Sequence, residues 1–231
     1  MDDVRKNTVP AENQTVRCVI CDEHTTGNIR LLFLGNSMTY HGRKDDLGWY
    51  NSCGMAASCT ENDYVHRLVG MLGEQRFPVD KCIVNVADWE RDYKNGDRVL
   101  SRGIYRSAAD FDADIIILRF LENCPPDNWS KPLFKKRLLE LMDYFNPSGK
   151  AQTILTTSFW RHIGSEAMEE IARENKLPCI GMTDLGDKDS MKAIGKFENE
   201  AVAMHPGDLG MESMAKRLLP AVINEINKIR S

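Results

Sequence analysis

The sequence lacks a long hydrophobic run and a surplus of charge of one sign. Its first residues, Met1 to Asn7, are polar and do not form the apolar core of a secretion signal, and no later run is long enough to span a bilayer. The formal net charge is -4, and acids and bases are mixed along the chain, so there is no basic stripe for a nucleic-acid backbone. These absences predict a cytoplasmic protein whose partners include neither a membrane nor a nucleic acid.

Paired cysteine motifs are also missing. The seven cysteines are odd in number and scattered, which fits a reducing compartment better than a disulfide framework. Cys18 and Cys21, with His24 close behind, have the spacing of half a zinc site, but no second close pair follows. The run Val16 to Ile20 is also typical of a short strand in which cysteines are small apolar residues, and we favour this interpretation.

Metal-binding motifs do not occur elsewhere in the chain either. A metal would have to recruit His41, Asp45 and Asp46, or the acid-rich run 184–189, and neither group has a spacing such as HExxH. Such clusters are usually solvated loop residues. We therefore predict no metal and no cofactor.

Internal repeats, low-complexity tracts and linkers are absent from the 231 residues, and β-type runs alternate with helical patterns. The expected strands are 30–34, 81–86, 114–119, 152–157 and 178–182. The expected helices are 61–75, 97–108, 131–145, 165–175 and 210–229. This alternation predicts a three-layer α/β/α sandwich with a mainly parallel, flavodoxin-like five-stranded sheet.

The segment before Arg30 adds to this plan. Residues 22–28 are rich in turn formers and lie between two β-type runs, so we expect an N-terminal hairpin or edge strand. We predict that residues 1–29 form an extension packed on a main domain of residues 30–231.

Three residues are expected at one edge of the sheet: Ser37 and Asn123 at strand ends, and His205 in a loop before the C-terminal helix that can fold back over that edge. The apolar run 30–34 breaks at Gly35 and delivers Ser37 to the carboxyl edge of the sheet, where ligands bind and where a following helix would point its free N–H groups. A serine nucleophile needs a general base and donors for an oxyanion, and His205 and Asn123 can supply them. Each alone is typical of a helix cap or a turn. Together, and in this chain order, they favour a nucleophile, a base and an oxyanion donor.

These residues resemble the sequence blocks of the SGNH (GDSL-like) hydrolases, which are serine esterases on a flavodoxin-like sheet. Gly35-Asn36-Ser37 is similar to the first block, Gly-Asp-Ser, with Asn36 in place of the aspartate. Residues 121–124 are similar to the third block, Gly-x-Asn-Asp, and keep only Asn123. Residues 202–206 are similar to the fifth block, Asp-x-x-His-Pro, so the resemblance extends from about Arg30 to the C-terminus.

Two departures from the family pattern affect the predicted site. Val202 occupies the position of the family's acid, so the Nδ1–H of His205 would donate to a backbone carbonyl, such as that of Val202, or to a carboxylate from elsewhere. We favour the carbonyl. The carboxylates that could take this place are Glu198, Glu200, Asp208, Glu90 and Asp184.

The second departure is the missing glycine of the family's second block. Its N–H would join the oxyanion hole, and here the N–H of Ala87 or Asp88 would replace it, beside the N–H of Ser37 and the side chain of Asn123.

Two long loops, 41–59 and 88–96, carry aromatic and polar residues that suit a sugar or another polyol. The candidate substrate-binding residues are Asn36, Trp49, Trp89, Glu90 and Trp160. The resemblance implies hydrolysis of an ester through an acyl-serine, and these loops favour a short acyl group, acetyl above all, on a carbohydrate or other small polar alcohol. Two alternatives stay open: an O-acyltransferase using the same site, and a small-ligand-binding protein that has lost catalysis. The sequence does not indicate an oligomeric state.

Overall fold

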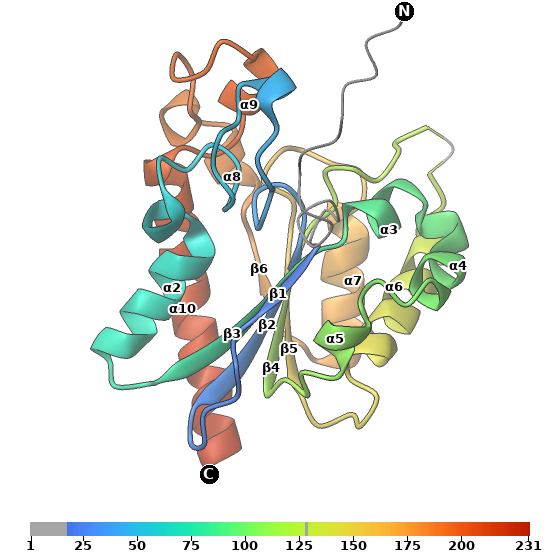
Figure 1. Cartoon of the computed structure of the whole chain (residues 1–231). Coiled ribbons are helices and arrows are strands. Elements are labelled where there is room, and N and C mark those ends of the chain that lie inside the picture. Colours follow the sequence, from blue (N-terminus) through green and yellow to red (C-terminus); the bar gives the residue numbers. More distant parts are fainter. Residues whose placement is uncertain (1–17, 128) are drawn as a thin grey trace, which may run out of the picture.

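The computed structural model describes residues 18–127 and 129–231, and in them a central sheet lies between two layers of helices (Figure 1). The strands are β1 (Val19–Cys21), β2 (Ile29–Gly35), β3 (Val79–Asn85), β4 (Ile115–Arg119), β5 (Gln152–Thr156) and β6 (Cys179–Ile180). Their order across the sheet is β1-β3-β2-β4-β5-β6, and every neighbouring pair except β1 and β3 is parallel. The five parallel strands have the flavodoxin-like order, which confirms the predicted fold class.

The N-terminal strand is an edge strand and not half of a hairpin. β1 runs antiparallel to β3, with Val19 opposite Val84, so β3 separates it from β2. Asp80 of β3 holds the connection between β1 and β2 by accepting hydrogen bonds from Thr25 N and Asn28 Nδ2, both at 2.6 Å. The first 17 residues of the predicted extension lie outside the described residues.

The register of β1 on β3 corrects the expectation that all cysteines are reduced. Cys21 lies directly opposite Cys82, and the two form a disulfide, a pairing that sequence spacing alone could not reveal. His24 lies 3.5 Å from the carboxylate of Asp80. Within residues 18–127 and 129–231, no group of three or more side chains is arranged to hold a metal ion.

The α-helices are α2 (Tyr64–Glu74), α3 (Ala87–Arg91), α4 (Gly96–Ser101), α5 (Arg106–Ala109), α6 (Lys131–Phe145), α7 (Ser165–Asn175), α8 (Thr183–Gly186), α9 (Glu200–Ala203) and α10 (Asp208–Arg230). Short 3-10 helices cover Asp45–Leu47, Thr60–Asn62, Tyr93–Asn95 and Asp189–Met191. α6 and α7 have the predicted bounds. No helix of the described chain is long and apolar enough to cross a membrane.

Two predicted helix boundaries are shifted for local reasons. α2 begins at Tyr64 because the side chain of Asp63 accepts from the N–H of His66 and caps the first turn. The helix expected over 97–108 is split into α4 and α5, since Gly103 between them has a φ of 73°.

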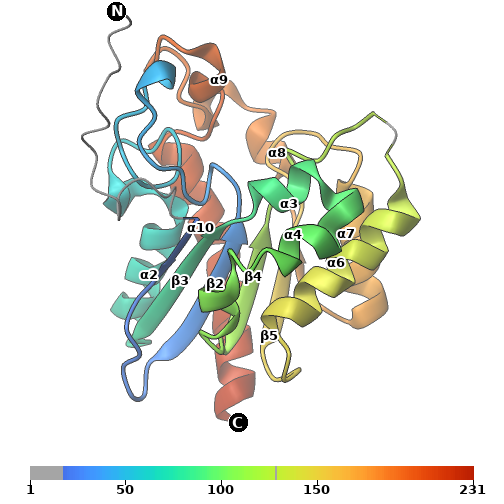
Figure 2. The same cartoon turned by 45° about the vertical axis from the view of Figure 1, so that its right-hand side comes forward.

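Alternate residues of the buried strands face two separate cores. On one face, Phe33 and Ile117 pack with the side chains of α2 and α10, whereas on the other, Leu34 and Leu118 pack with those of α6 and α7. Figure 2 shows the helices of the second layer in front of the sheet. Full burial of one such side chain stabilises the fold by about 1.5–3 kcal/mol. The two packed layers therefore hold the strands, and with them the strand ends that carry the candidate site, in place.

Candidate active site

Ser37 lies in a tight turn just beyond the end of β2. Gly35 is needed there, because a Cβ on it would lie 1.7 Å from Thr39 Oγ1 and 2.9 Å from the carbonyl oxygen of Arg119. The N–H groups of Thr39 and Tyr40 both donate to the carbonyl oxygen of Asn36. The chain then continues as a loop, so the helix expected after Ser37, and the dipole argument based on it, are wrong.

The side chains of Ser37 and His205 are in hydrogen-bond contact. Ser37 Oγ lies 2.9 Å from His205 Nε2, and His205 Nδ1 lies 2.7 Å from the carbonyl oxygen of Ala201. A carbonyl oxygen can only accept, so Nδ1 carries the proton and Nε2 presents a lone pair. The Ser37 hydroxyl therefore donates to Nε2, which is the arrangement that a general base requires.

The group that orients His205 is a backbone carbonyl, although not the one expected. Ala201 accepts from the ring because it lies four residues before His205, at the start of the turn that α9 makes. The carbonyl oxygen of Val202 accepts the backbone N–H of His205 instead.

The carboxylates considered as partners of His205 either bond to other residues or are exposed. Asp208 accepts from the N–H and hydroxyl of Ser58, and Asp184 pairs with Arg217. Glu198 and Glu200 are exposed. Burial lowers the pKa of His205 to about 4, and its bond to the Ala201 carbonyl offsets this only in part, so the imidazole is neutral at pH 7.

Trp160 packs against the histidine. Its ring meets the His205 ring edge to face, with centroids 5.1 Å apart, and its Nε1 donates to the carbonyl oxygen of Met204 at 3.2 Å. Of the five candidate substrate-binding residues, Trp160 is the one that lies beside the Ser37–His205 pair and is partly exposed.

The other four candidates are fully buried, which contradicts their predicted contact with substrate. Trp49 packs on Phe197, and Trp89 packs on Phe120 in the opposite core. The remaining two, Asn36 and Glu90, belong to a buried polar network. Trp49 and Trp89 thus pack the protein interior and do not form a sugar platform.

This largely buried network includes Asn36, the chain neighbour of Ser37, and comprises Asn36, Glu90, Arg119, Glu122 and Asn123. Arg119 pairs with Glu122 and donates to Asn36 Oδ1 at 3.0 Å, and Asn36 Nδ2 donates to Glu122 Oε2 at 2.6 Å. Burial alone would raise the pKa of Glu122. The charge of Arg119 and the hydrogen bonds that Glu122 accepts hold that pKa below its usual range. Sequence reasoning missed Arg119 and Glu122, although an arginine inside an apolar strand is a signal of such a pair.

The expected oxyanion donors differ in whether their N–H groups already donate hydrogen bonds within the protein. The N–H of Ala87 donates to Asn85 Oδ1 at 2.9 Å and is therefore engaged, whereas Asp88 follows it in the first turn of α3 with its side chain exposed. Asn123 donates one hydrogen of its amide to Glu90 Oε2 at 2.8 Å. Because a side-chain amide carries two hydrogens, the second can serve a ligand.

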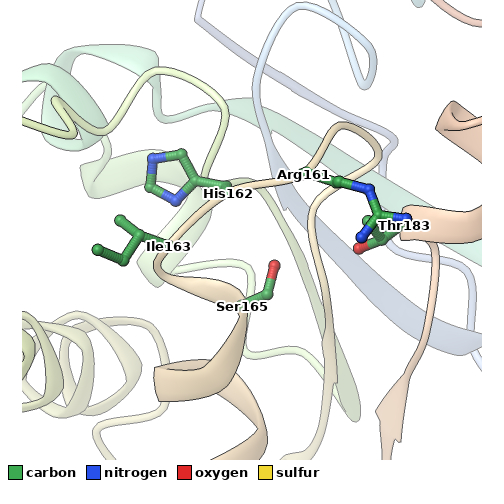
Figure 3. Close-up of a pocket in the computed structure, with 5 residues that line it drawn as sticks. All are labelled: Arg161, His162, Ile163, Ser165 and Thr183. Carbon is green, nitrogen blue, oxygen red and sulfur yellow. The ribbon is translucent and has the colours of Figure 1, made fainter.

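A hollow of about 350 Å³ is lined by Arg161, the residue after Trp160, and by four further residues. Figure 3 shows its lining, in which His162 lies on the loop from β5 into α7, Ser165 begins α7 and Thr183 begins α8. The ring of His162 contacts the carbonyl oxygen of Cys124, which links this loop to the one that carries Asn123. Its lining residues have polar or charged side chains except for Ile163.

The fold is shared with solved structures of esterases and GDSL-like proteins. An esterase from Pseudoalteromonas sp., whose structure was determined inhibited by monoethylphosphonate, superposes with a TM-score of 0.57 at 11% identity, covering 87% of this chain and 100% of that one. A GDSL-like lipase from Parabacteroides merdae, named as putative, gives 0.54 at 15% identity, covering 84% and 95%.

A salicylyl-acyltransferase from a tetracycline biosynthetic pathway gives a TM-score of 0.58 at 14% identity, over 88% of this chain and 56% of that one. No protein-family model matches the sequence, and the curated proteins contain no significant relative. The likeness therefore concerns the fold, and the activity has to be argued from the site.

Proposed function

We propose that this protein is a serine esterase that hydrolyses short acyl esters of small polar alcohols. The observation that carries the proposal is the 2.9 Å contact from Ser37 Oγ to His205 Nε2, with the Nδ1 proton directed to the Ala201 carbonyl. This arrangement supplies a nucleophile and a base in the correct tautomer at neutral pH.

The proposed reaction proceeds through an acyl-serine. His205 Nε2 takes the Ser37 proton as Oγ attacks the ester carbonyl carbon, and the negative oxygen that develops is met by the N–H of Ser37 and the amide of Asn123. As the tetrahedral intermediate collapses, the bond to the alcohol oxygen breaks and His205 gives that oxygen its proton. Water then gives a proton to His205 as its oxygen attacks the acyl carbon. The bond from that carbon to Ser37 Oγ breaks, His205 returns the proton to Oγ, and the carboxylic acid leaves.

The proposed substrate class rests on the hollow whose lining begins with Arg161, next in the chain to Trp160. The hollow beyond Trp160 is lined by Arg161, His162, Ser165 and Thr183 besides one apolar residue, which favours a polar alcohol over a lipid. The aromatic argument for a sugar is lost with the burial of Trp49 and Trp89, so the alcohol is proposed only as small and polar, and an acylated sugar is one member of that class.

Hydrolysis of p-nitrophenyl acetate, butyrate and octanoate tests the proposal. We expect the acetate to give the highest kcat/KM and Ser37→Ala to abolish turnover, whereas Ser52→Ala, at an exposed serine, leaves it unchanged. Turnover that survives in Ser37→Ala would refute the serine mechanism. A sugar alcohol added as acceptor separates the alternatives, because formation of its ester in place of free acid would assign the site to an acyltransferase.

A further inference from the structure

Glu90 lies in α3, next to the candidate site, and its side chain is fully buried. Its Oε1 accepts hydrogen bonds from Leu121 N at 2.7 Å, Asn123 N at 3.2 Å and Asn36 Nδ2 at 3.3 Å. Its Oε2 accepts from Asn123 Nδ2 at 2.8 Å. One carboxylate thus joins the turn that carries Ser37 to both the backbone and the side chain of Asn123.

The backbone that Glu90 holds is strained. Leu121 has a φ of 141°, a conformation that favours glycine, and its side chain is fully buried. A non-glycine residue persists in such a conformation only where its surroundings fix it. The bond from the Leu121 N–H to Glu90 is one such restraint, and Asn123 lies two residues further along the same turn.

We propose that Glu90 is a positioning residue that acts through Asn123: its carboxylate fixes the turn after β4 and orients the second amide hydrogen of Asn123 toward the oxyanion. The inference rests on the proposed function, because it assigns a role within that site. It differs from the roles expected from sequence, since the Glu90 side chain is fully buried and its hydrogen bonds go to Leu121, Asn123 and Asn36.

The protonation of Glu90 gives the proposal a pH signature. The charged and titratable groups around it are Arg119 and Glu122, which form a pair, together with Cys124 and Tyr105. Burial, and then the carboxylate of Glu122, raise the pKa of Glu90 to about 6. Protonation places a hydrogen on an oxygen that faces N–H donors, so at least one of the four bonds is lost as the pH falls through about 6.

A double-mutant cycle between Glu90→Gln and Asn123→Ala tests the coupling. We expect Glu90→Gln to lower kcat by about 10- to 100-fold with little change in KM, because a misdirected donor costs transition-state stabilisation. In an Asn123→Ala background the same change should cost less than about threefold, since Glu90 would have nothing left to orient. Losses that multiply would overturn the proposal.

Glu225→Gln is the matched control. Glu225 is also a buried carboxylate, but it lies in the C-terminal part of α10 and pairs with Lys228, so its amide variant should leave kcat unchanged. Equal loss of kcat in Glu90→Gln and Glu225→Gln would show general loosening of the fold and overturn the positioning role.

A second measurement needs no activity and no mutant that must fold. In the ¹⁵N-labelled wild-type protein, the Asn123 side-chain amide and the Leu121 backbone amide should titrate together with a midpoint near the Glu90 pKa of about 6. The absence of that shared titration would overturn the inference. If the wild type lacks Ser37-dependent ester hydrolysis, the proposed function fails, and the amide titration then decides alone whether Glu90 orients Asn123.

Discussion

The candidate site has a base side, formed by Ser37 and His205, and an oxyanion side, formed by Asn123 and its neighbours. The two sides differ in whether buried carboxylates hold their side chains in place. On the base side, the imidazole is oriented by one backbone carbonyl at 2.7 Å. On the oxyanion side, two buried carboxylates, Glu90 and Glu122, accept hydrogen bonds from the backbone and from side chains.

This difference shows that a carboxylate can serve such a site in two ways. Beside the histidine it would stabilise the imidazolium directly, which a carbonyl does less strongly because it carries only a partial charge. Beneath the oxyanion donor it fixes geometry, since buried charges that accept several N–H bonds hold those donors in place. The predictions below test the base side first, then the oxyanion side, then the absence of a carboxylate partner.

Removal of either member of the base side has the largest expected effect. Ser37→Ala and His205→Ala should each lower kcat/KM for p-nitrophenyl acetate by at least about 10³-fold, because nucleophile and base act as one unit. The double variant should be no worse than the poorer single variant. Circular dichroism checks that the fold is kept, and a His205→Ala enzyme with near-normal turnover would contradict the pairing.

On the oxyanion side, Asn123→Ala should lower kcat by about 10²- to 10³-fold with little change in KM, the usual loss for one oxyanion donor. Steady-state kinetics with the aryl acetate measure both constants. A large rise in KM at unchanged kcat would assign Asn123 to ground-state binding instead.

Acid should inactivate the base side at an unusually low pH. Burial lowers the pKa of His205 to about 4, and the neutral ring is the form that accepts the serine proton, so activity is present above that pH and lost as pH falls through it. The Glu90→Gln variant isolates the protonation of His205, because it removes the fall in activity near pH 6 that is assigned to protonation of Glu90. Its kcat/KM should fall about tenfold per pH unit below 4, and a midpoint at the ordinary histidine value of 6.5 would show a solvated imidazole.

The smallest expected effect comes from the exposed carboxylates that were considered as partners of His205. Glu198→Gln, Glu200→Gln and Asp184→Asn should each leave kcat within about twofold, because surface changes away from a site rarely matter and none of these groups contacts the imidazole. A loss of several orders of magnitude in one of them, with its fold intact, would place a carboxylate on the base side after all.

The main elements of the fold were predictable from the sequence because buried parallel strands are continuous apolar runs. The predicted strand 30–34 lies within β2, and the order of strand ends explains why Ser37 and Asn123 come together at one edge. Ser37 contacts His205 at this edge because the loop between α9 and α10, which carries His205, folds back over it.

Other features depend on contacts that local sequence does not encode. The orientation of loop aromatics is decided by distant partners, as with Trp49 on Phe197, so burial could not be separated from exposure. The carbonyl that orients His205 depends on the four-residue helix α9, which has no clear hydrophobic period. The role of Glu90 depends on a turn after β4, and the two segments meet only in the folded sheet.

Reaction with an ethyl p-nitrophenyl phosphonate tests the central claim, an activated Ser37, most directly. The account predicts one covalent adduct per chain, located on Ser37 by mass spectrometry of peptides, and labelling that is at least about 10²-fold slower in His205→Ala because the base is missing. An unlabelled protein, or label on a serine other than Ser37, would contradict it.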